Sequence, residues 1–522
     1  MNRTLIRNGF LFIVAMTVLV GLFLHPAQAV ILGETGTAFN LTAMEGSIRT
    51  GDGDSVPMWL FAVPDKVEQY PGPTLIVNQG DTVSVTLTNQ LKVPVSLLFP
   101  GQKVTVTNSV GGVPGLLTTE VPPDNGNSSV TYTFIAAQPG TYTYYSGTQP
   151  ELEVEMGLQG AIVVRPAGFN ATQTATALGG RKAFTNVSTA YDREYLMLLS
   201  EIDVEQHKAA GRGELRSIDH TDRRPVTWFE NGRTMPDTVA DPGASYLPSQ
   251  PYNSFPQSHP GEKILIRFVG AGLDLHPLHT HGQNHLQIAR DGRLLNSVMS
   301  NDLTPDLGVS DYTTTVVPGE TVDAIYGVWT AAKLDWDIYG PKEGSPGFGR
   351  TINWDQFVPL AVTMPGHQCI YPNGTVAPLV SAACNQAISN DPNCFDPVTH
   401  EYCPDHDKDF PVQLPTQTEL TFGNMWGGTP FLGALQTLPP VNTNDGLFHS
   451  QQNPQAGISF MWHSHNEREI TTNNIFLGGM ATMSLILPYC SFDPVTGFLP
   501  VQIDADNTDE AAVCTALQTR PH

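Results

Sequence analysis

The stretch Leu275-His276-Pro277-Leu278-His279-Thr280-His281-Gly282-Gln283-Asn284-His285 decides the architecture and the chemistry that this chain can support. It follows residues 261–269, where charged and apolar side chains alternate as they do in a β-strand. If the strand period continues, His279 and His281 point to the same face, because side chains two residues apart lie on one side of a strand. Imidazole nitrogens bind copper and zinc well. The stretch therefore predicts a metal-binding edge of a β-sheet.

A second histidine pair lies far downstream, at the end of Phe460-Met461-Trp462-His463-Ser464-His465. Its His-x-His spacing repeats that of His279 and His281, and it too follows an apolar strand. A polar strand edge would explain one such pair. Two pairs in the same setting favour a shared metal site, at which the four imidazoles meet across the interface of the domains that carry them.

The composition indicates a turn-rich all-β protein. The chain has 522 residues, with 48 Gly, 42 Pro and only 15% charged residues, a balance that does not suit a helical protein. The formal net charge of −24 argues against nucleic acid as a partner. An acidic surface attracts metal cations, although solubility explains the charge equally well.

The first 29 residues have the pattern of a secretion signal. Arg3 and Arg7 precede an apolar run from Phe10 to Leu24, and Ala27-Gln28-Ala29 fits a cleavage site. The run is short for a membrane anchor, and no later segment predicts a membrane span. We therefore expect a secreted or periplasmic product that begins at Val30.

The cysteines fit an oxidising compartment. An even number in a secreted chain predicts three disulfides of open connectivity, and a zinc site is the alternative. All six lie in the last third of the chain: Cys369, Cys384, Cys394, Cys403, Cys490 and Cys514.

The chain contains an internal repeat of domain size. Gly80-Asp81 and Gly261-Glu262 begin similar strands, and eighteen residues further on stand Leu98 and His279. Regularly spaced short strands predict Greek-key sandwiches. The predicted units are a signal segment 1–29, a first domain 30–166, a second domain 190–366, a cysteine-rich insert 367–411, a third domain 412–490 and a tail 491–522.

These motifs together resemble the multicopper oxidases, the laccase-like family of tandem cupredoxin domains. Residues 276–282 are similar to the family's His-Pro-x-His-x-His-Gly motif, and residues 463–465 to its His-x-His motif. The resemblance implies three tandem cupredoxin-like Greek-key β-sandwich domains, copper as cofactor, and oxidation of a small organic or metal-ion substrate by dioxygen. It also implies that His276 binds a blue copper, and that a copper cluster is held by His279, His281, His463 and His465.

The sequence departs from the family at several positions where copper ligands are expected. Ser464 stands where a blue copper needs a cysteine thiolate, and Glu469 stands where the family has a further histidine. In the first domain, residues 98–101 and 145–147 replace two histidine motifs with Leu-Phe-Pro-Gly and Tyr-Ser-Gly. Four of the eight cluster histidines remain, so one or two coppers are the most that the set can hold.

Three neighbouring side chains have two interpretations each. His285 either assists the metal site or is packed in the core, and Met480 is either an axial ligand by position or core packing. Glu467 either serves the site or lies in a solvated loop. For the whole chain, two functions remain: a copper oxidoreductase with a reduced site, or a non-catalytic copper-binding or scaffold protein that kept the fold.

Overall fold

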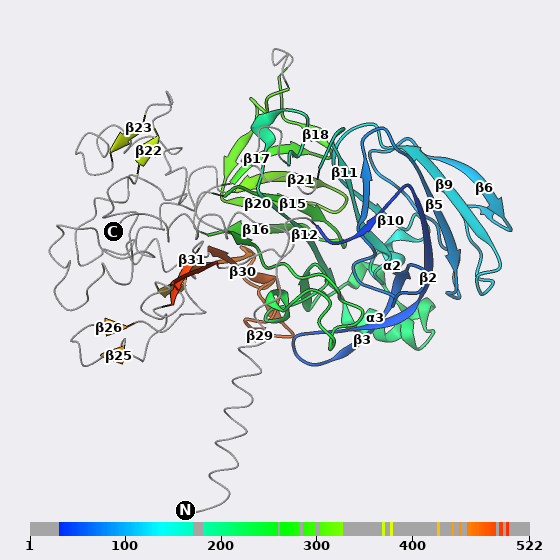
Figure 1. Cartoon of the computed structure of the whole chain (residues 1–522). Helices are drawn as coiled ribbons and strands as arrows, with labels where there is room; N and C mark the ends of the chain where they lie inside the picture. Colours follow the sequence, from blue (N-terminus) through cyan, green and yellow to red (C-terminus); the bar gives the residue numbers. More distant parts are fainter. Residues whose placement is uncertain are drawn as a thin grey trace, which may run out of the picture.

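The computed structural model describes residues 31–170, 181–258, 262–281, 285–297, 303–326 and 457–486, together with the backbone of short strands elsewhere. The predicted signal segment, the side chains of all six cysteines and residues 501–522 lie outside the described part. Within that part the chain is built of strands with few helices, which confirms the predicted all-β class. Figure 1 shows two β-sandwiches packed side by side, the first blue to cyan and the second mainly green.

The first sandwich is formed by residues 34–165. In its strand β5 the apolar Val83, Val85 and Leu87 are buried while the residues between them are more exposed, as the alternating sequence predicts. These side chains share one core with residues of the facing sheet, including Leu75, Tyr144 and others. One sheet has the order β1 (Glu34–Thr35), β4 (Leu75–Asn78), β11 (Gln159–Arg165), β10 (Gly140–Tyr145); the other has the order β3 (Ser55–Ala62), β2 (Ala38–Arg49), β5 (Thr82–Asn89), β9 (Ser129–Ile135), β6 (Thr105–Val110), with the hairpin β7 (Val113–Pro114) and β8 (Thr119–Glu120) beside them.

The second sandwich combines two larger sheets around a core that contains Phe268, Leu278 and Trp462. Its first sheet has the order β18 (Arg293–Leu294), β17 (His285–Arg290), β21 (Thr321–Tyr326), β15 (Ile264–Gly270), β12 (Arg193–Ile202), β13 (Thr227–Glu230), β28 (Thr471–Thr472), β29 (Ile475–Phe476), with β19 (Val309–Asp311) paired to β17. Its second sheet has the order β14 (Gln257–Ser258), β30 (Ala481–Ile486), β27 (Gly457–Ser464), β16 (His276–Thr280), β20 (Thr313–Val316), with β24 (Met425–Gly428) paired to β27.

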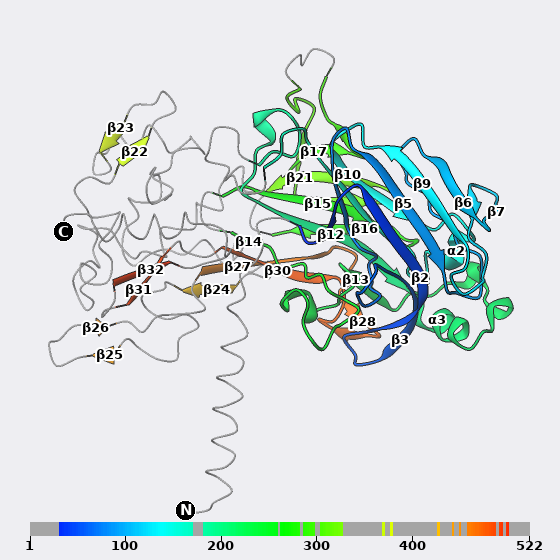
Figure 2. The ribbon, with the colours of Figure 1, turned by 45° about the vertical axis from the view of Figure 1, so that its right-hand side comes forward.

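The second sandwich joins segments that the sequence assigns to different domains. β27 and β30 belong to the predicted third domain, 412–490, yet they lie in one sheet with β14 and β16 of the predicted second domain. Figure 2 shows these strands, brown and green, next to one another. The expectation that the two histidine pairs face each other across a domain interface is therefore wrong. Strand β16 pairs antiparallel with β20 on one side and antiparallel with β27 on the other, so the two histidine pairs lie on adjacent strands of one sheet.

Helices are short and lie outside the sheets. α3 (Val204–Gly211) begins at Asp203, whose carboxylate accepts hydrogen bonds from the backbone N–H groups of Glu205 and Gln206 and so caps the helix. Among the described residues, no helix combines the length and apolar character that a membrane crossing requires. The remaining helical turns are α2 (Pro150–Glu153), η1 (Val187–Thr189), η2 (Leu215–Ser217), η3 (His220–Asp222) and η4 (Asp237–Val239). The remaining strand pairs are β22 (Gln368–Ile370) with β23 (Val376–Pro378), β25 (Val441–Asn442) with β26 (Phe448–His449), and β31 (Cys490–Asp493) with β32 (Gly497–Pro500).

The two sandwiches are held together by apolar and charged contacts. Ile76 and Val163 of the first sandwich share a buried cluster with Leu198 and Val269 of the second. Beside it the buried Arg267 donates to Thr141 Oγ1 of the first sandwich at 3.0 Å. This packing fixes the sheet from which the site residues project.

Candidate metal centre and the buried network beside it

The register between β16 and β27 places the two histidine pairs next to each other. The strands run antiparallel with His279 opposite His463 and Leu278 opposite Ser464. Along β16 the burial alternates, and Leu278 and Thr280 face the core while His279 is half-buried on the other face. Because directly opposite residues share a face, both His-x-His pairs project from the same side of the sheet.

The four imidazoles form a compact cluster. The Nε2 atoms of His281 and His463 are 3.2 Å apart. The ring centroids of His279 and His465 are 4.6 Å apart, and those of His281 and His463 are 5.1 Å apart. Ring centroids are 4.7 Å apart for His279 and His281, 5.2 Å for His463 and His465, and 5.7 Å for His279 and His463.

Hydrogen bonds to neighbouring backbone and side-chain groups set the orientation of the rings. His463 Nδ1 lies 2.7 Å from the carbonyl oxygen of Ser464, which can only accept, so Nδ1 carries the proton. In the neutral ring Nε2 of His463 is then an acceptor, and it faces His281 Nε2, which donates to it. On the far side of the cluster His279 Nδ1 bonds to Thr313 Oγ1 at 2.9 Å. Such second partners are the usual way in which a protein orients histidine ligands.

The backbone of His281 is also held in place. Its carbonyl oxygen accepts hydrogen bonds from the Tyr326 hydroxyl at 3.0 Å and from Trp462 Nε1 at 3.2 Å. The rings of Tyr326 and Trp462 meet edge to face with centroids 4.9 Å apart, and both are fully buried. A rigid aromatic pair under the cluster therefore fixes the end of β16.

The environment keeps these rings neutral. Burial, together with the neighbouring His279 and His463, lowers the pKa of His281 to about 3. Burial likewise lowers the pKa of His279 to about 4, helped by His465 and His463, and it lowers the pKa of His463. A neutral imidazole is the form that binds a metal ion, so no imidazolium has to be deprotonated first.

Four imidazole nitrogens are a donor set that suits copper. Two imidazole nitrogens on one ion lie roughly 3–4 Å apart, given metal–nitrogen bonds of about 2.0–2.1 Å, and the 3.2 Å between the Nε2 atoms of His281 and His463 agrees with this. In the described residues no group of three or more His, Cys, Asp or Glu side chains already has the arrangement that would hold an ion. The rings of His279 and His465 must therefore turn to complete a site.

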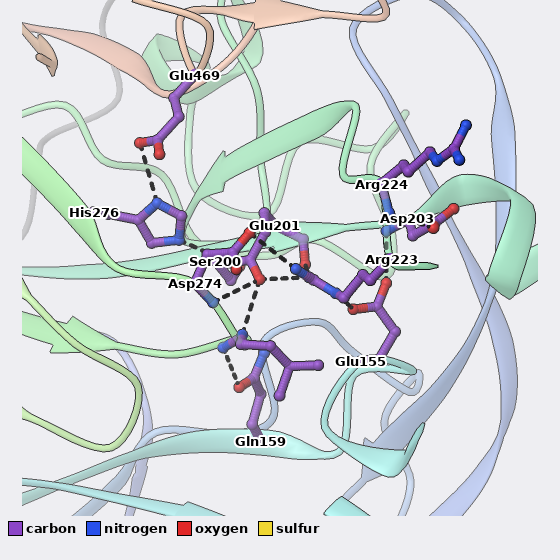
Figure 3. Close-up of polar contacts among 12 residues, drawn as sticks. Glu155, Gln159, Ser200, Glu201, Asp203, Arg223, Arg224, Asp274, His276 and Glu469 are labelled. Atoms are coloured by element: carbon purple, nitrogen blue, oxygen red, sulfur yellow. Dashed lines mark hydrogen bonds and ion pairs between the residues drawn. The ribbon is translucent and has the colours of Figure 1, made fainter. Parts of the chain in front are cut away.

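The structure does not bring His276 to this cluster. It lies three residues before His279, an odd separation, so its fully buried ring faces the core instead. There His276 Nε2 is 2.7 Å from Glu201 Oε2, and Nδ1 is 3.1 Å from Glu469 Oε2, as Figure 3 shows. Carboxylate oxygens accept, so both ring nitrogens donate and the ring is an imidazolium. Burial disfavours that charge, but the two glutamates outweigh it and raise the pKa of His276 to about 9.

The three positions that correspond to blue-copper ligands in the family lie close together here, but their side chains bond to one another. Ser464 Oγ donates to Glu469 Oε2 at 2.5 Å, and the same oxygen accepts from His276. Asn466 Nδ2 donates to the other oxygen of Glu469 at 2.9 Å. A blue copper requires a thiolate and neutral imidazoles, whereas these three positions form a charged hydrogen-bonded unit. His276 as a copper ligand is thus not supported by its surroundings.

A chain of buried charges extends this unit toward the first sandwich. Arg223 pairs with Glu201, with Glu155 Oε2 at 2.6 Å and with Asp274 Oδ2 at 2.9 Å. These residues come from four separate segments, and Figure 3 shows them lined up from Glu469 to Glu155. The carboxylates raise the pKa of Arg223 although burial opposes the charge. Asp274 and Glu469 lie close to the histidine motifs. Glu155, Glu201 and Arg223 lie in distant strands or loops, so the sequence around the motifs does not indicate the network.

The three side chains with two interpretations have clear places. His285 is fully buried, its Nδ1 is 2.9 Å from Thr280 Oγ1 and its Nε2 is 2.6 Å from Thr314 Oγ1. Met480 is fully buried in the apolar core. The Glu467 side chain is 72% exposed, with Oε1 3.9 Å from His465 Nδ1. These surroundings fit a packed His285, a core Met480 and a solvated Glu467.

The first sandwich repeats the arrangement without the histidines. Leu98 and Tyr145 pair through two backbone hydrogen bonds of 2.8 and 3.2 Å, as His279 pairs with His463 in the second sandwich. The serine that follows, Ser146, donates to the buried Glu153, as Ser464 donates to Glu469. Leu98 and His279 therefore occupy equivalent positions in the two sandwiches, as the eighteen-residue spacing predicts.

The fold and this site define a tandem cupredoxin-like β-sandwich protein with a partial histidine centre. Comparison with known proteins agrees. The family profile described as multicopper oxidase matches residues 62–168, within the first sandwich. The chain therefore carries a domain of the multicopper oxidase family, and copper is the cofactor that this family implies.

Curated relatives match only part of the chain. Copper resistance protein A of Escherichia coli is 26% identical over 300 residues, which cover 51% of this chain and 42% of that protein. The iron transport multicopper oxidase fetC of Epichloe festucae (strain E2368) is 40% identical over 124 residues, 21% of this chain and 19% of that protein. The matches span less than half the length of either relative.

Among solved structures, a blue copper oxidase from Nitrosomonas europaea is similar with a TM-score of 0.45 and 16% identity, covering 86% of each chain. A copper nitrite reductase from the same organism has a TM-score of 0.37 and 21% identity, covering 56% of this chain and 84% of that one.

Proposed function

We propose that this chain is a copper-binding protein whose ion is held by His279, His281, His463 and His465. The observation that carries the proposal is the convergence of the four rings, with two Nε2 atoms 3.2 Å apart on adjacent strands. The low pKa values of about 3 for His281 and about 4 for His279 support it, because these rings stay neutral and ready to bind.

Electron transfer through a blue copper is not part of the proposal. Ser464 lacks a thiolate, and Glu469 and Glu201 hold His276 as an imidazolium that cannot donate to a metal. In the first sandwich, Leu98 and Tyr145 offer no imidazole to complete a larger cluster. A chain of this kind would bind or carry copper rather than pass electrons between two copper centres.

A second function is direct redox chemistry at the histidine cluster. Half of the His465 side chain is exposed, so a small organic or metal-ion reductant could approach that ring from solvent. Copper bound there would supply one-electron redox chemistry. The chain's own part would be to hold the ion, with His281 and His463 buried beneath it.

We further propose that the protein works in a secreted or periplasmic compartment. The signal-like residues 1–29 and the six cysteines support this. Export can be tested by comparing the N-terminus of the recovered protein with Val30.

Copper titration of the whole chain against a chelator of known affinity tests the proposed site. Replacing His281 and His465 together with alanine should weaken tight copper binding by more than the ~10–100-fold that removal of a supporting residue costs. Either single replacement should weaken it less.

His220→Ala is the matched control, because His220 lies in the short helix η3 and not in the cluster. Equal copper affinity in the control and the double variant would overturn the proposed site. Oxygen consumption by copper-loaded protein with a small phenol or ferrous iron then separates the two functions, since a simple copper carrier consumes none above free copper.

A further inference from the structure

Two methionines stand on the sheet face that carries the histidine cluster. Met461 and Met483 lie directly opposite each other on the adjacent strands β27 and β30. Met461 precedes His463 by two residues, so both side chains leave β27 on the same side. Because directly opposite residues share a face, Met483 lies on that side as well. The face that carries the imidazoles therefore continues into a pair of thioethers.

The end of β16 brings His281 beside this pair. β16 and β27 run antiparallel with Thr280 opposite Trp462. The next position along sets His281 opposite Met461, and the His281 N–H donates to the Met461 carbonyl oxygen at 3.4 Å. His281, Met461 and Met483 thus form one row across three chain segments, with neighbouring strands about 4.8 Å apart.

The two methionines face away from the apolar core. Among the described residues, the core beneath this sheet contains Phe460 and Trp462, the neighbours of Met461 on either side, and it contains Met480. Met461 and Met483 are not part of it. Both are half-buried, so an ion can approach them from solvent. Core packing therefore does not account for the pair.

The geometry of the pair suits one metal ion. Directly opposite side chains on antiparallel strands have Cβ atoms about 4.5–5.5 Å apart. Metal–sulfur bonds are about 2.3 Å for zinc and similar for copper, so two sulfur atoms on opposite sides of one ion lie roughly 4.6 Å apart. A methionine side chain is unbranched and flexible, and it can bring its sulfur to this separation while the strands stay in place.

The thioether sulfurs determine which ion the pair prefers. Soft sulfur ligands select Cu(I), whereas hard cations such as Ca²⁺ and Mg²⁺ require oxygen ligands. A thioether is uncharged and has no proton to lose, so binding at the pair does not compete with protons. The imidazoles of the cluster, in contrast, also suit Cu(II).

We propose that Met461 and Met483 hold a Cu(I) ion beside the histidine cluster, with His281 as the neighbouring nitrogen donor. The inference rests on the proposed copper-binding function in one respect, because His281 belongs to both sets. One sheet face would then bind copper in both oxidation states, Cu(II) at the imidazoles and Cu(I) at the thioethers. Each set binds the ion as it arrives, and no electron is transferred on binding.

Ag(I) is the probe for the test, because it is a soft ion like Cu(I) and keeps its oxidation state in air. The full chain is used with any free thiols blocked by N-ethylmaleimide. NMR spectra of isotope-labelled methionine methyl groups then report which sulfurs bind. The signals of Met461 and Met483, assigned with the single Met→Leu variants, should shift with Ag(I) and not with Zn(II).

Replacing both methionines measures their share of the affinity. Met461→Leu with Met483→Leu should weaken Ag(I) binding by more than the roughly tenfold that loss of a supporting residue costs. Leucine has nearly the same volume as methionine, so the fold should be kept. Met44→Leu is the matched control, because Met44 is a half-buried strand methionine that stands opposite Leu60 and not opposite a second sulfur. It should leave Ag(I) affinity unchanged.

Cu(II) titration separates this inference from the proposed function. The double methionine variant should keep its Cu(II) affinity, which the joint replacement of His281 and His465 should weaken. If Cu(II) does not bind at the histidines while Ag(I) still shifts the two methyl signals, the proposed function fails and the methionine site stands. Equal Ag(I) affinity in the wild type and the double methionine variant overturns the methionine site. Methyl shifts at other methionines but not at Met461 and Met483 also overturn it, and this result needs no variant to fold.

Discussion

Raising the pH through about 9 should remove folding free energy that His276 contributes, because the ring is held as an imidazolium between Glu201 and Glu469. Its pKa is raised from 6.5 to about 9 in the folded chain. At about 1.4 kcal/mol for each pKa unit, this shift corresponds to about 3 kcal/mol. The buried position means that solvent does not screen the interaction.

The sign follows from the direction of the shift. The folded chain binds this proton more tightly than the unfolded chain, so the contribution is complete below pH 6.5 and disappears as the pH rises to about 9. Removing the imidazolium by mutation should destabilise the chain most below about pH 6.5, because two carboxylates then stay buried without the positive charge that the wild type has there.

Urea unfolding of the wild type and of His276→Gln, at about pH 6 and pH 9.5, measures this contribution. The wild type should lose about 3 kcal/mol more than the variant between the two pH values. An NMR titration of the His276 ring should show the same pKa. Equal losses in both proteins, or a ring that titrates near 6.5, would refute the assignment of His276 as an imidazolium.

Other measurements test the histidine cluster. Copper affinity of a His465→Ala variant should change little between about pH 8 and pH 5, because the pKa values of His279 and His281 are about 4 and 3 and that of His463 is lowered; a tenfold loss for each pH unit starting near 6.5 in a chelator competition would contradict this. Copper-loaded protein should lack the intense absorption near ~600 nm of a copper–thiolate bond, because Ser464 is no thiolate, and a strong blue band in the visible spectrum would show that a cysteine binds the ion. Trp462→Phe removes the donor to the His281 carbonyl and should lower the free energy of unfolding by about 1–3 kcal/mol; chemical denaturation that finds no change would show that this bond is not needed.

The strand period accounts for what the sequence predicts well. His279 and His281, like His463 and His465, share a face because they are two residues apart. The same rule separates His276 from them, three residues before His279, and the alternation alone could have placed it in the core. The all-β class followed from equally local features, such as the alternation along Thr82–Asn89.

Long-range pairing limits what the sequence predicts. Strands β16 and β27 pair although a long segment separates them in the sequence, and no local pattern reveals that two distant strands are neighbours. The partners of His276 are hidden for the same reason. Glu201 lies in β12, 75 residues before His276, and it reaches the site only after both sheets have packed.

The most direct test of the central claim is pulsed electron paramagnetic resonance of the Cu(II)-loaded chain, which counts the imidazole nitrogens around the ion. We expect couplings from more than one imidazole in the wild type and in His220→Ala, and fewer imidazole couplings when His281 and His465 are both replaced by alanine. Copper with only oxygen ligands in the wild type, or an unchanged number of imidazole couplings in the double variant, would contradict the assignment of copper to this histidine cluster.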